Sequence, residues 1–342
     1  MPLAYDDEDH QAIERCLGPD EPLHGLISEC LNLAEDPFAL DIHPDESGVL
    51  HYVHGTVELM AAGVGLCDQI VFIHAGTAYC NRRRGEYGKV SLGNSRIIDA
   101  FHLEEAGEGL RFVLHYLRAA IAGCPDDCYR DGRRGYWLNR LSLSLCRDWH
   151  PGCEWFVLDR DRTVFPPRTG DGWPLEVYRT FRRFEILKHE RQQADPERWG
   201  RPSTHGLEGE CDLIAIGPAG ELLLIDVRHG SEGVDLCWSA LKLAAYAETV
   251  RAVDQSDRYF TSLGRLLRRR AALGLCPQEA LKRWPLSGFS RVVPVLVVAE
   301  PDDQSACWDR LEELADGEPA ARIQVVRLHR GQSADQIMLS HS

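Results

Sequence analysis

The sequence predicts an α/β protein in two parts: a separate α+β domain over residues 1–165, and a domain over residues 172–335 whose mixed sheet is flanked by helices. Three observations support this organisation. The 342 residues exceed the length of a typical single domain. Residues 166–174 are rich in proline and glycine and form the best candidate boundary. After that boundary an antiparallel hairpin is followed by alternating helix and strand patterns, which is typical of a mixed sheet.

The N-terminal half combines helix and strand patterns. Apolar residues recur at helical spacing in residues 109–123, and short apolar runs with alternating polar residues favour strands elsewhere. The expected elements are helices at 6–17, 23–36 and 109–123 and strands or hairpins at 48–59, 68–76 and 153–167. No residue in this half indicates a specific chemistry, so the role of the domain is left open.

The C-terminal half predicts a sheet that is covered on both faces. Residues 291–300 form a nearly continuous apolar run, which is typical of a strand buried on both sides. The other expected elements are helices at about 235–253, 258–273, 277–284 and 306–315, and a strand at 321–330. Alternation of this kind places helices beside the sheet.

Composition and charge restrict the partners. The net charge of −15 disfavours nonspecific binding of a polyanion over the whole surface, so any nucleic-acid contact must be local. No apolar run approaches the length of a membrane span, and the first residues are acidic, unlike a secretory signal. We therefore expect a cytoplasmic protein without a membrane partner, which could form a homodimer.

Basic side chains gather at four places that could provide a local contact. These are Arg82 to Arg84, Arg130 to Arg134, Arg179 to Arg191, and Arg265 to Arg270. The third cluster includes Arg182, Arg183 and Lys188 and lies on a predicted helix. A solvated helix face with acidic partners explains the same pattern equally well.

The twelve cysteines are scattered, and without an export signal they are expected to be reduced thiols. Cys124, Cys128, Cys146 and Cys153, with His150 nearby, could bind zinc, although their irregular spacing favours plain cysteines.

Three histidines offer a second candidate metal cluster. His43, His51 and His54 lie near apolar strand residues, where satisfied core or surface histidines are the more common interpretation.

The hairpin expected at residues 209–228 carries two acidic side chains in an apolar setting. Asp212 lies on its first strand and Asp226 on its second, with a Gly-Pro-Ala-Gly turn between them. Facing positions of a hairpin are within side-chain contact, and Arg228 shares the face of Asp226 because side chains alternate along a strand. Buried carboxylates need compensation, so this pair indicates a site for a hard metal ion.

An acid, one intervening residue and a cation, lying across from a second acid, resemble the signature of the PD-(D/E)XK nuclease superfamily. The similarity covers roughly residues 172–300 and includes Glu210 beside the first acid. This resemblance implies a restriction-endonuclease-like fold. It also implies a Mg²⁺ or Mn²⁺ cofactor held by Asp212 and Asp226, with DNA more than RNA as the substrate.

The resemblance extends to the flanking helices. Gly170 to Phe181 is similar to the opening helix of related enzymes, which implies that Glu176 completes the metal shell, with Glu185 as the fallback. Lys242-x-x-x-Tyr246 stands where some members carry Gln-x-x-x-Tyr. Lys242 could supply an ammonium group from this helix.

Arg228 departs from the pattern, because the family usually has a lysine there. A guanidinium stays protonated and cannot act as a general base, but it can neutralise charge on a phosphate undergoing substitution. Three interpretations therefore remain open. The chain is a metal-dependent nuclease acting in bacterial defence or repair, a catalytically inactive nuclease-like domain that binds nucleic acid or a protein, or an acidic interaction protein in which the hairpin is ordinary core.

Overall fold

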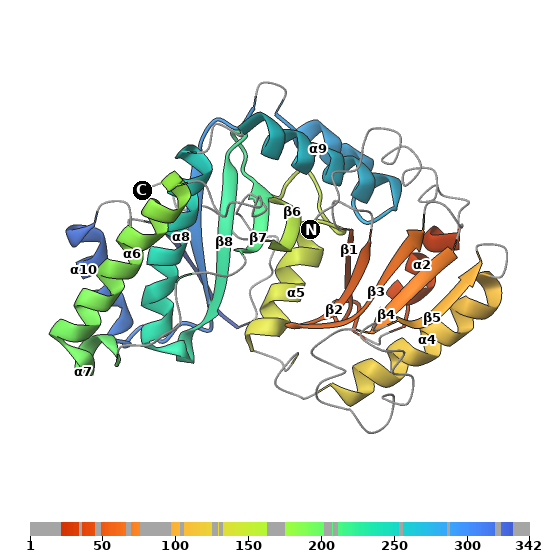
Figure 1. The fold of residues 1–342 in the computed structure, drawn as a ribbon, viewed down its shortest axis with the longest axis horizontal. Coiled ribbons are helices and arrows are strands. Elements are labelled where there is room, and N and C mark those ends of the chain that lie inside the picture. Colours follow the sequence, from red (N-terminus) through yellow and green to blue (C-terminus); the bar gives the residue numbers. More distant parts are fainter. Residues whose placement is uncertain are drawn as a thin grey trace. The chain divides into compact units, whose positions relative to one another are not determined.

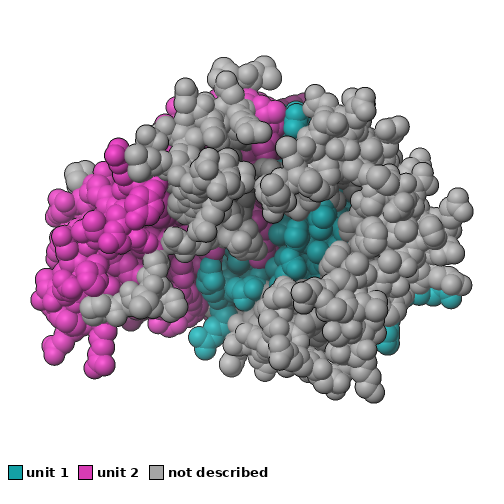
Figure 2. All heavy atoms as spheres, viewed as in Figure 1, with its two compact units in different colours: residues 1–149, 264–281 teal, residues 150–263, 282–342 magenta. Residues whose placement is uncertain are grey.

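The computed structural model describes residues 22–33, 36–44, 49–65, 70–75, 97–102, 106–124, 129, 133–162, 175–201, 207, 211–252, 256–285, 288–318 and 323–330. The chain divides into two compact units (Figure 2). The first contains residues 1–149 and 264–281, and the second contains residues 150–263 and 282–342.

This division differs from the boundary expected at residues 166–174. The units divide between Trp149 and His150, because strand β6 (Phe156–Arg162) pairs with the second sheet. The chain also returns to the first unit from Gly264 to Leu281. A local composition of proline and glycine could not reveal either feature, because both depend on pairing and packing with residues distant in the sequence. The proline- and glycine-rich segment lies outside the described residues.

The first unit contains a five-stranded antiparallel sheet in sequential order. Its strands are β1 (Asp41–Pro44), β2 (Leu50–His54), β3 (Val57–Gly65), β4 (Ile70–Ala75) and β5 (Ile97–His102), and its helices are α2 (Pro22–Leu31), α4 (Ala106–Gly123) and α5 (Arg134–Ser144). The expected strands β2, β3 and β4 and helices α2 and α4 are confirmed. β1, β5 and α5 were not predicted, because their short or weakly periodic sequences carry little local signal.

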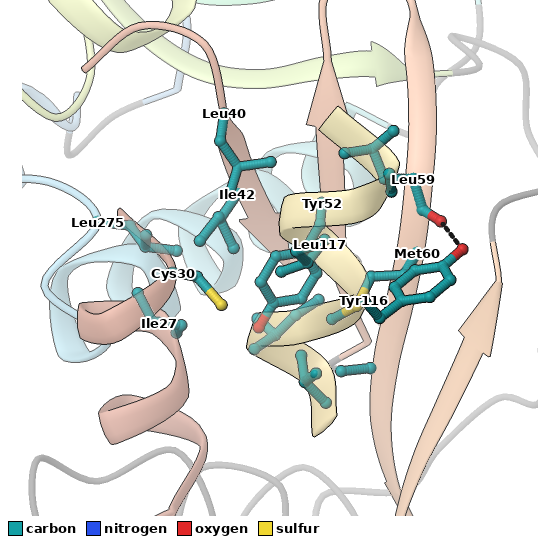
Figure 3. Close-up of a cluster of buried hydrophobic side chains, with 14 of the residues drawn as sticks. Ile27, Cys30, Leu40, Ile42, Tyr52, Leu59, Met60, Tyr116, Leu117 and Leu275 are labelled. Carbon is teal, nitrogen blue, oxygen red and sulfur yellow. Dashed lines mark hydrogen bonds between the residues drawn. The ribbon is translucent and has the colours of Figure 1, made fainter. Parts of the chain in front are cut away.

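Apolar side chains from the sheet, α2 and α4 form the core of the first unit (Figure 3). Tyr52 is fully buried in this cluster, and the Tyr116 hydroxyl donates a 3.0 Å hydrogen bond to the carbonyl of Leu59. Leu275 joins the same cluster, although it is far away in the sequence. The return of the chain to this unit therefore contributes to its core.

The second unit contains a five-stranded mixed sheet in the order β10-β9-β8-β7-β6. In addition to β6, its strands are β7 (Cys211–Ile216), β8 (Leu222–His229), β9 (Val292–Ala299) and β10 (Gln324–Leu328). β6, β7 and β8 are antiparallel, whereas β8, β9 and β10 are parallel. The expectation of a mixed sheet is confirmed, and seven consecutive residues of β9 are buried, as expected for a strand covered on both faces.

Helices cover this sheet in a layered arrangement. They are α6 (Leu175–Ala194), α7 (Pro196–Trp199), α8 (Val234–Ala252) and α10 (Cys307–Gly317). α8 packs directly on β8 and β9, and α6 and α10 pack against α8 (Figure 1). α9 (Ser256–Ala272) begins in the second unit and ends in the first, and it is followed by the short 3-10 helix η3 (Gln278–Arg283). Among the described residues no helix combines the length and apolar character needed to cross a membrane.

The β7–β8 turn is stabilised by glycine and by an acid. Gly220 has a φ of 76°, a conformation that side chains disfavour. The Glu221 carboxylate accepts a 2.8 Å hydrogen bond from the Ala219 amide and lies 3.1 Å from the Arg291 guanidinium. These contacts stabilise the turn end of the hairpin.

Candidate functional site

The β7–β8 hairpin brings Asp212 and Asp226 to neighbouring positions. Leu213 pairs with Ile225 in the antiparallel ladder, and each acid lies one residue beyond that pair. The two acids therefore occupy the same face of the sheet. Asp226 is 0% exposed and Asp212 is 4% exposed, so both charges lie away from water and need compensating partners.

Two cations contact Asp226. The Arg228 Nε donates a 2.7 Å hydrogen bond to Oδ2 of Asp226, and the Lys242 Nζ lies 3.1 Å from Oδ1. Arg228 comes from the same strand, two residues later, while Lys242 comes from α8, which packs on β8. Both carboxylate oxygens therefore have a cationic donor, which offsets the cost of burying the charge.

Asp212 is tied to the second strand through the backbone. Its Oδ2 accepts a 2.7 Å hydrogen bond from the Val227 amide. This amide follows Asp226 directly, so the bond fixes the first acid beside the second. The neighbouring Cys211 is fully buried, and burial raises the pKa of its thiol, so the thiol stays protonated.

Arg228 is held from two sides. Its Nη1 lies 3.2 Å from Oε2 of Glu232, and Oε1 of Glu232 accepts a 2.8 Å hydrogen bond from the His229 amide. Burial alone would lower the pKa of Arg228, but the charges of Asp226 and Asp212 outweigh it and raise this pKa above its ordinary value. The guanidinium is therefore permanently charged and cannot accept a proton from water.

The ammonium group of Lys242 lies near an aromatic ring. Its ammonium lies 5.6 Å from the centre of the Tyr246 ring, one helical turn further along α8. The Tyr246 ring in turn lies 5.7 Å from that of Phe181 on α6. The i,i+4 spacing of Lys242 and Tyr246 places both side chains on one face of α8. The structure thus brings Lys242 beside Asp226.

The third predicted metal ligand is not placed. Glu176 lies near the beginning of α6, but its side chain is outside the described part of the chain, as is Glu210. Glu185, the fallback, lies 3.6 Å from Arg182 on the same helix. The residues that the structure brings together are therefore Asp226, Arg228 and Lys242, with Asp212 beside them.

Two nearby acids escaped the sequence-based prediction. Asp159 on β6 pairs with Ile214, so it lies on the same face of the sheet as Asp212, and it is buried. The strand had been assigned to the other domain, and only its pairing with β7 reveals this position. Glu232 was also missed, because its contact with Arg228 depends on the tight turn that follows β8.

The other candidate metal clusters have different partners. Nδ1 of His51 lies 2.7 Å from the Glu58 carboxylate, and Nδ1 of His54 lies 2.6 Å from the Ala39 carbonyl. Burial lowers the pKa of His54, so this residue is neutral at pH 7. Within the described ranges no three histidine, cysteine or acidic residues gather in a group able to bind a metal ion.

The four cysteines considered for zinc do not form a described cluster. Cys146 contacts Arg270, and Cys124 packs against the first core. The Cys153 carbonyl accepts a hydrogen bond from Arg283, and Cys128 lies outside the described residues.

The basic clusters differ in accessibility. Arg182 is exposed, whereas Lys188 is buried next to Trp238, and burial lowers its pKa. In the last cluster Arg269 and Arg270 are buried, so these two residues do not belong to a surface patch. Arg82 to Arg84 lie outside the described residues.

Comparisons with known protein families, with curated proteins and with solved structures found no match to this chain.

Proposed function

We propose that the second unit is a metal-dependent nuclease with a restriction-endonuclease-like core. The observation that carries this proposal is the buried Asp226 carboxylate in contact with both Arg228 and Lys242, directly beside Asp212. Phosphodiester hydrolysis needs carboxylates that bind a metal ion and cations that neutralise a phosphate. Asp212 and Asp226 are such carboxylates, and Arg228 and Lys242 are such cations. The mixed sheet that carries them agrees with the proposed core.

The donor atoms suit a hard divalent cation. Asp212 and Asp226 supply carboxylate oxygens from adjacent strands, and carboxylate oxygens are ligands that such ions prefer. Asp212 and Asp226 would hold Mg²⁺ or Mn²⁺, with Glu176 as the proposed third ligand. The ion would supply Lewis acidity at the phosphate.

The two cations would act on the substrate. Arg228 and Lys242 neutralise Asp226 in the free protein, and in a complex they would pair with phosphate oxygens and stabilise the charge that develops there. Because Arg228 cannot act as a base, its role is electrostatic. Glu232 would orient the guanidinium through the 3.2 Å contact.

The exposed side of α6 offers a local contact for nucleic acid. Tyr178 is 57% exposed and the Arg182 side chain is 58% exposed, and they are four residues apart on one helix face. An exposed aromatic ring can stack on a base while a guanidinium binds phosphate. Such a local contact is compatible with a net charge of −15.

One observation favours a catalytically inactive binding domain as the second candidate. Both oxygens of Asp226 already receive a cation from the chain itself, so the buried charge is compensated without a metal ion. In this second candidate the same cluster would have a structural role, and α6 could still bind nucleic acid.

A cleavage assay separates the two candidates. The purified full-length protein is incubated with plasmid, single-stranded DNA and RNA in Mg²⁺ or Mn²⁺, alongside Asp212→Asn and Asp226→Asn. We expect cleavage by the wild-type protein that stops in EDTA and falls by at least about 100-fold in both variants, because each removes a carboxylate ligand. Cleavage that survives Asp226→Asn would indicate a contaminating nuclease.

Glu221→Gln provides a matched control for the folded state. Glu221 is also buried and paired with an arginine, but it lies at the turn end of the same hairpin. Its substitution should leave cleavage unchanged. A second readout is the melting temperature with and without Mn²⁺, because an ion that binds the folded state must raise it. Neither cleavage nor a metal-dependent shift would exclude the nuclease and favour the inactive binding domain.

A further inference from the structure

Two cysteines and an arginine form a buried cluster in the first unit that the proposed nuclease does not use. Cys146 lies in the turn after α5 and Cys276 lies just after α9. Nη1 of Arg270 lies 3.1 Å from the Cys146 sulfur. The Cys146 sulfur also lies 3.6 Å from the Leu275 carbonyl oxygen. Because Cys276 directly follows Leu275 in the chain, both cysteines and the guanidinium are close neighbours.

The position of this pair in the chain is distinctive. The chain leaves the first unit after Trp149 and returns to it at Gly264. Cys146 precedes the departure by three residues and Cys276 follows the return, so a bond between them would close the loop that contains residues 150–263. Cys146 is 2% exposed and Cys276 is 5% exposed, so only small reagents can reach them in the folded protein.

The surroundings favour a thiolate on Cys146. The neighbouring Cys276 thiol and the Arg270 guanidinium lower the pKa of Cys146 to about 7, against the opposing effects of burial and of Asp41. The neighbouring Cys146 and burial raise the pKa of Cys276, so this thiol stays protonated. A thiolate next to a protonated thiol is the arrangement in which one sulfur attacks an oxidant and the other resolves the product.

We propose that Cys146 and Cys276 form a redox-active dithiol that a hydroperoxide converts reversibly to an intramolecular disulfide. The Cys146 thiolate attacks one oxygen of hydrogen peroxide, the O–O bond breaks, and a sulfenic acid and one water form after proton uptake. The Cys276 sulfur then attacks the sulfenic sulfur, the S–O bond breaks, and a second water leaves. Two thiols are oxidised and one peroxide is reduced to two waters.

The second unit contains a matched pair of cysteines for comparison. The Cys237 thiol lies 3.6 Å from the backbone carbonyl of Cys307, and both residues are buried. Burial raises the pKa of Cys237 to about 12, so this thiol stays protonated at pH 7. Cys237 and Cys307 thus resemble the proposed pair in burial and proximity, but the raised pKa of Cys237 keeps its thiol protonated.

Peptide mapping tests the proposal. The reduced full-length protein is treated with one to a few equivalents of hydrogen peroxide, its remaining thiols are blocked with N-ethylmaleimide, and it is digested without reduction. We expect a peptide pair linked through Cys146 and Cys276 that disappears after dithiothreitol. Cys146→Ser and Cys276→Ser should each abolish this linked pair, whereas Cys237→Ser should leave its rate of formation unchanged.

Arg270→Lys tests the role of the cation, because it keeps the charge but loses the planar guanidinium, and Arg270→Met removes the charge. Disulfide formation at pH 7 should slow at least several-fold in Arg270→Met and less in Arg270→Lys. Circular dichroism identifies any variant that fails to fold, and the wild-type comparison of Cys146 with Cys237 remains informative in that case. The proposal is overturned if the linked pair does not form, if it joins two copies of the chain, or if Cys146 and Cys237 react at the same rate in the wild-type protein.

Discussion

At the scale of single residues, the candidate site depends on the two cations that neutralise the buried charge of Asp226. Its carboxylate is fully buried, and its two oxygens receive Arg228 and Lys242. Removing one partner of a buried ion pair is costly, because the other charge then stays buried without compensation. The same three groups therefore contribute to stability and to the proposed chemistry.

Asp226→Asn should lower the free energy of unfolding by about 3 kcal/mol, because two buried or half-buried cations lose their anionic partner. Urea unfolding followed by far-UV circular dichroism measures this loss. Asp226→Asn combined with Lys242→Met should recover part of it, because the double variant removes one of the uncompensated cations. A double variant as unstable as the sum of the two single variants would show that the ion pair has no coupling energy.

The reactivity of Cys146 should depend on pH. Because the pKa of Cys146 is lowered to about 7, the thiolate fraction rises as the pH increases through 7, and alkylation should accelerate over the same interval. Cys276, Arg270 and Asp41 are the neighbouring titratable groups that affect this pKa. Mass spectrometry after short pulses of iodoacetamide between pH 5 and about 9 measures the rate. A rate for Cys146 that changes only above the ordinary thiol pKa would contradict the prediction.

At the scale of secondary-structure elements, α8 explains why Lys242 reaches the site. The helix packs on β8 and β9 and is covered by α6 and α10, and its apolar residues surround the axis. A lysine inside such a helix is costly unless it meets an acid. Asp226 on β8 supplies that acid, so the packing of α8 on β8 brings Lys242 to the acidic residues of the hairpin.

The end of β8 needs a glycine because another segment passes close to it. A Cβ on Gly230 would lie 2.3 Å from the Glu300 carbonyl oxygen and 2.9 Å from the Pro301 Cα. Gly230→Ala should therefore displace the end of β8 and lower the free energy of unfolding by about 2 kcal/mol or more. Because His229 and Glu232 hold Arg228 at this place, the variant should also reduce any nuclease activity.

Gly220→Ala is the appropriate comparison for Gly230→Ala. Gly220 has a positive φ, but its added Cβ would meet only the Pro285 side chain, at 3.3 Å. The cost should be about 1 kcal/mol, arising from backbone strain at the turn. Thermal unfolding of both variants measures the difference. Equal losses would argue against the close approach of residues 300 and 301 to β8.

At the scale of the whole molecule, two properties of the chain determine how it could bind a polyanion. The net charge is −15, and α6 carries the exposed Arg182 and Arg183. Long-range repulsion therefore opposes binding, while a few arginines at α6 provide direct phosphate contacts. Binding should be weak, local and sensitive to salt.

The salt dependence tests this local contact. Fluorescence anisotropy with a labelled duplex between about 50 and 200 mM salt gives the slope of log K against log salt concentration. Arg179→Gln combined with Arg182→Gln should reduce this slope by about 2, because each phosphate contact contributes roughly 0.9. Arg291→Gln is the control and should leave the slope unchanged; Arg291 directly precedes β9 and contacts Glu221. An unaltered slope in the α6 variant would place the contact elsewhere.

The sequence by itself determined the elements with strong periodicity and the chemistry of one hairpin. Helix α4 follows from apolar spacing and strand β9 from a continuous apolar run, and the adjacent positions of Asp212 and Asp226 follow from side-chain alternation across a short turn. These features are local, so the residues that determine them lie close together in the chain.

Only the tertiary structure decided which distant segments meet. It shows that β6 pairs with β7 and that residues 264–281 belong to the first unit. It also shows that Lys242 contacts Asp226 and that Cys146 contacts Arg270 near Cys276. Each of these contacts joins segments separated by a loop or a whole element, and local propensity carries no information about such pairings. They arise because burial of apolar surface and compensation of buried charge are satisfied by the packed chain as a whole.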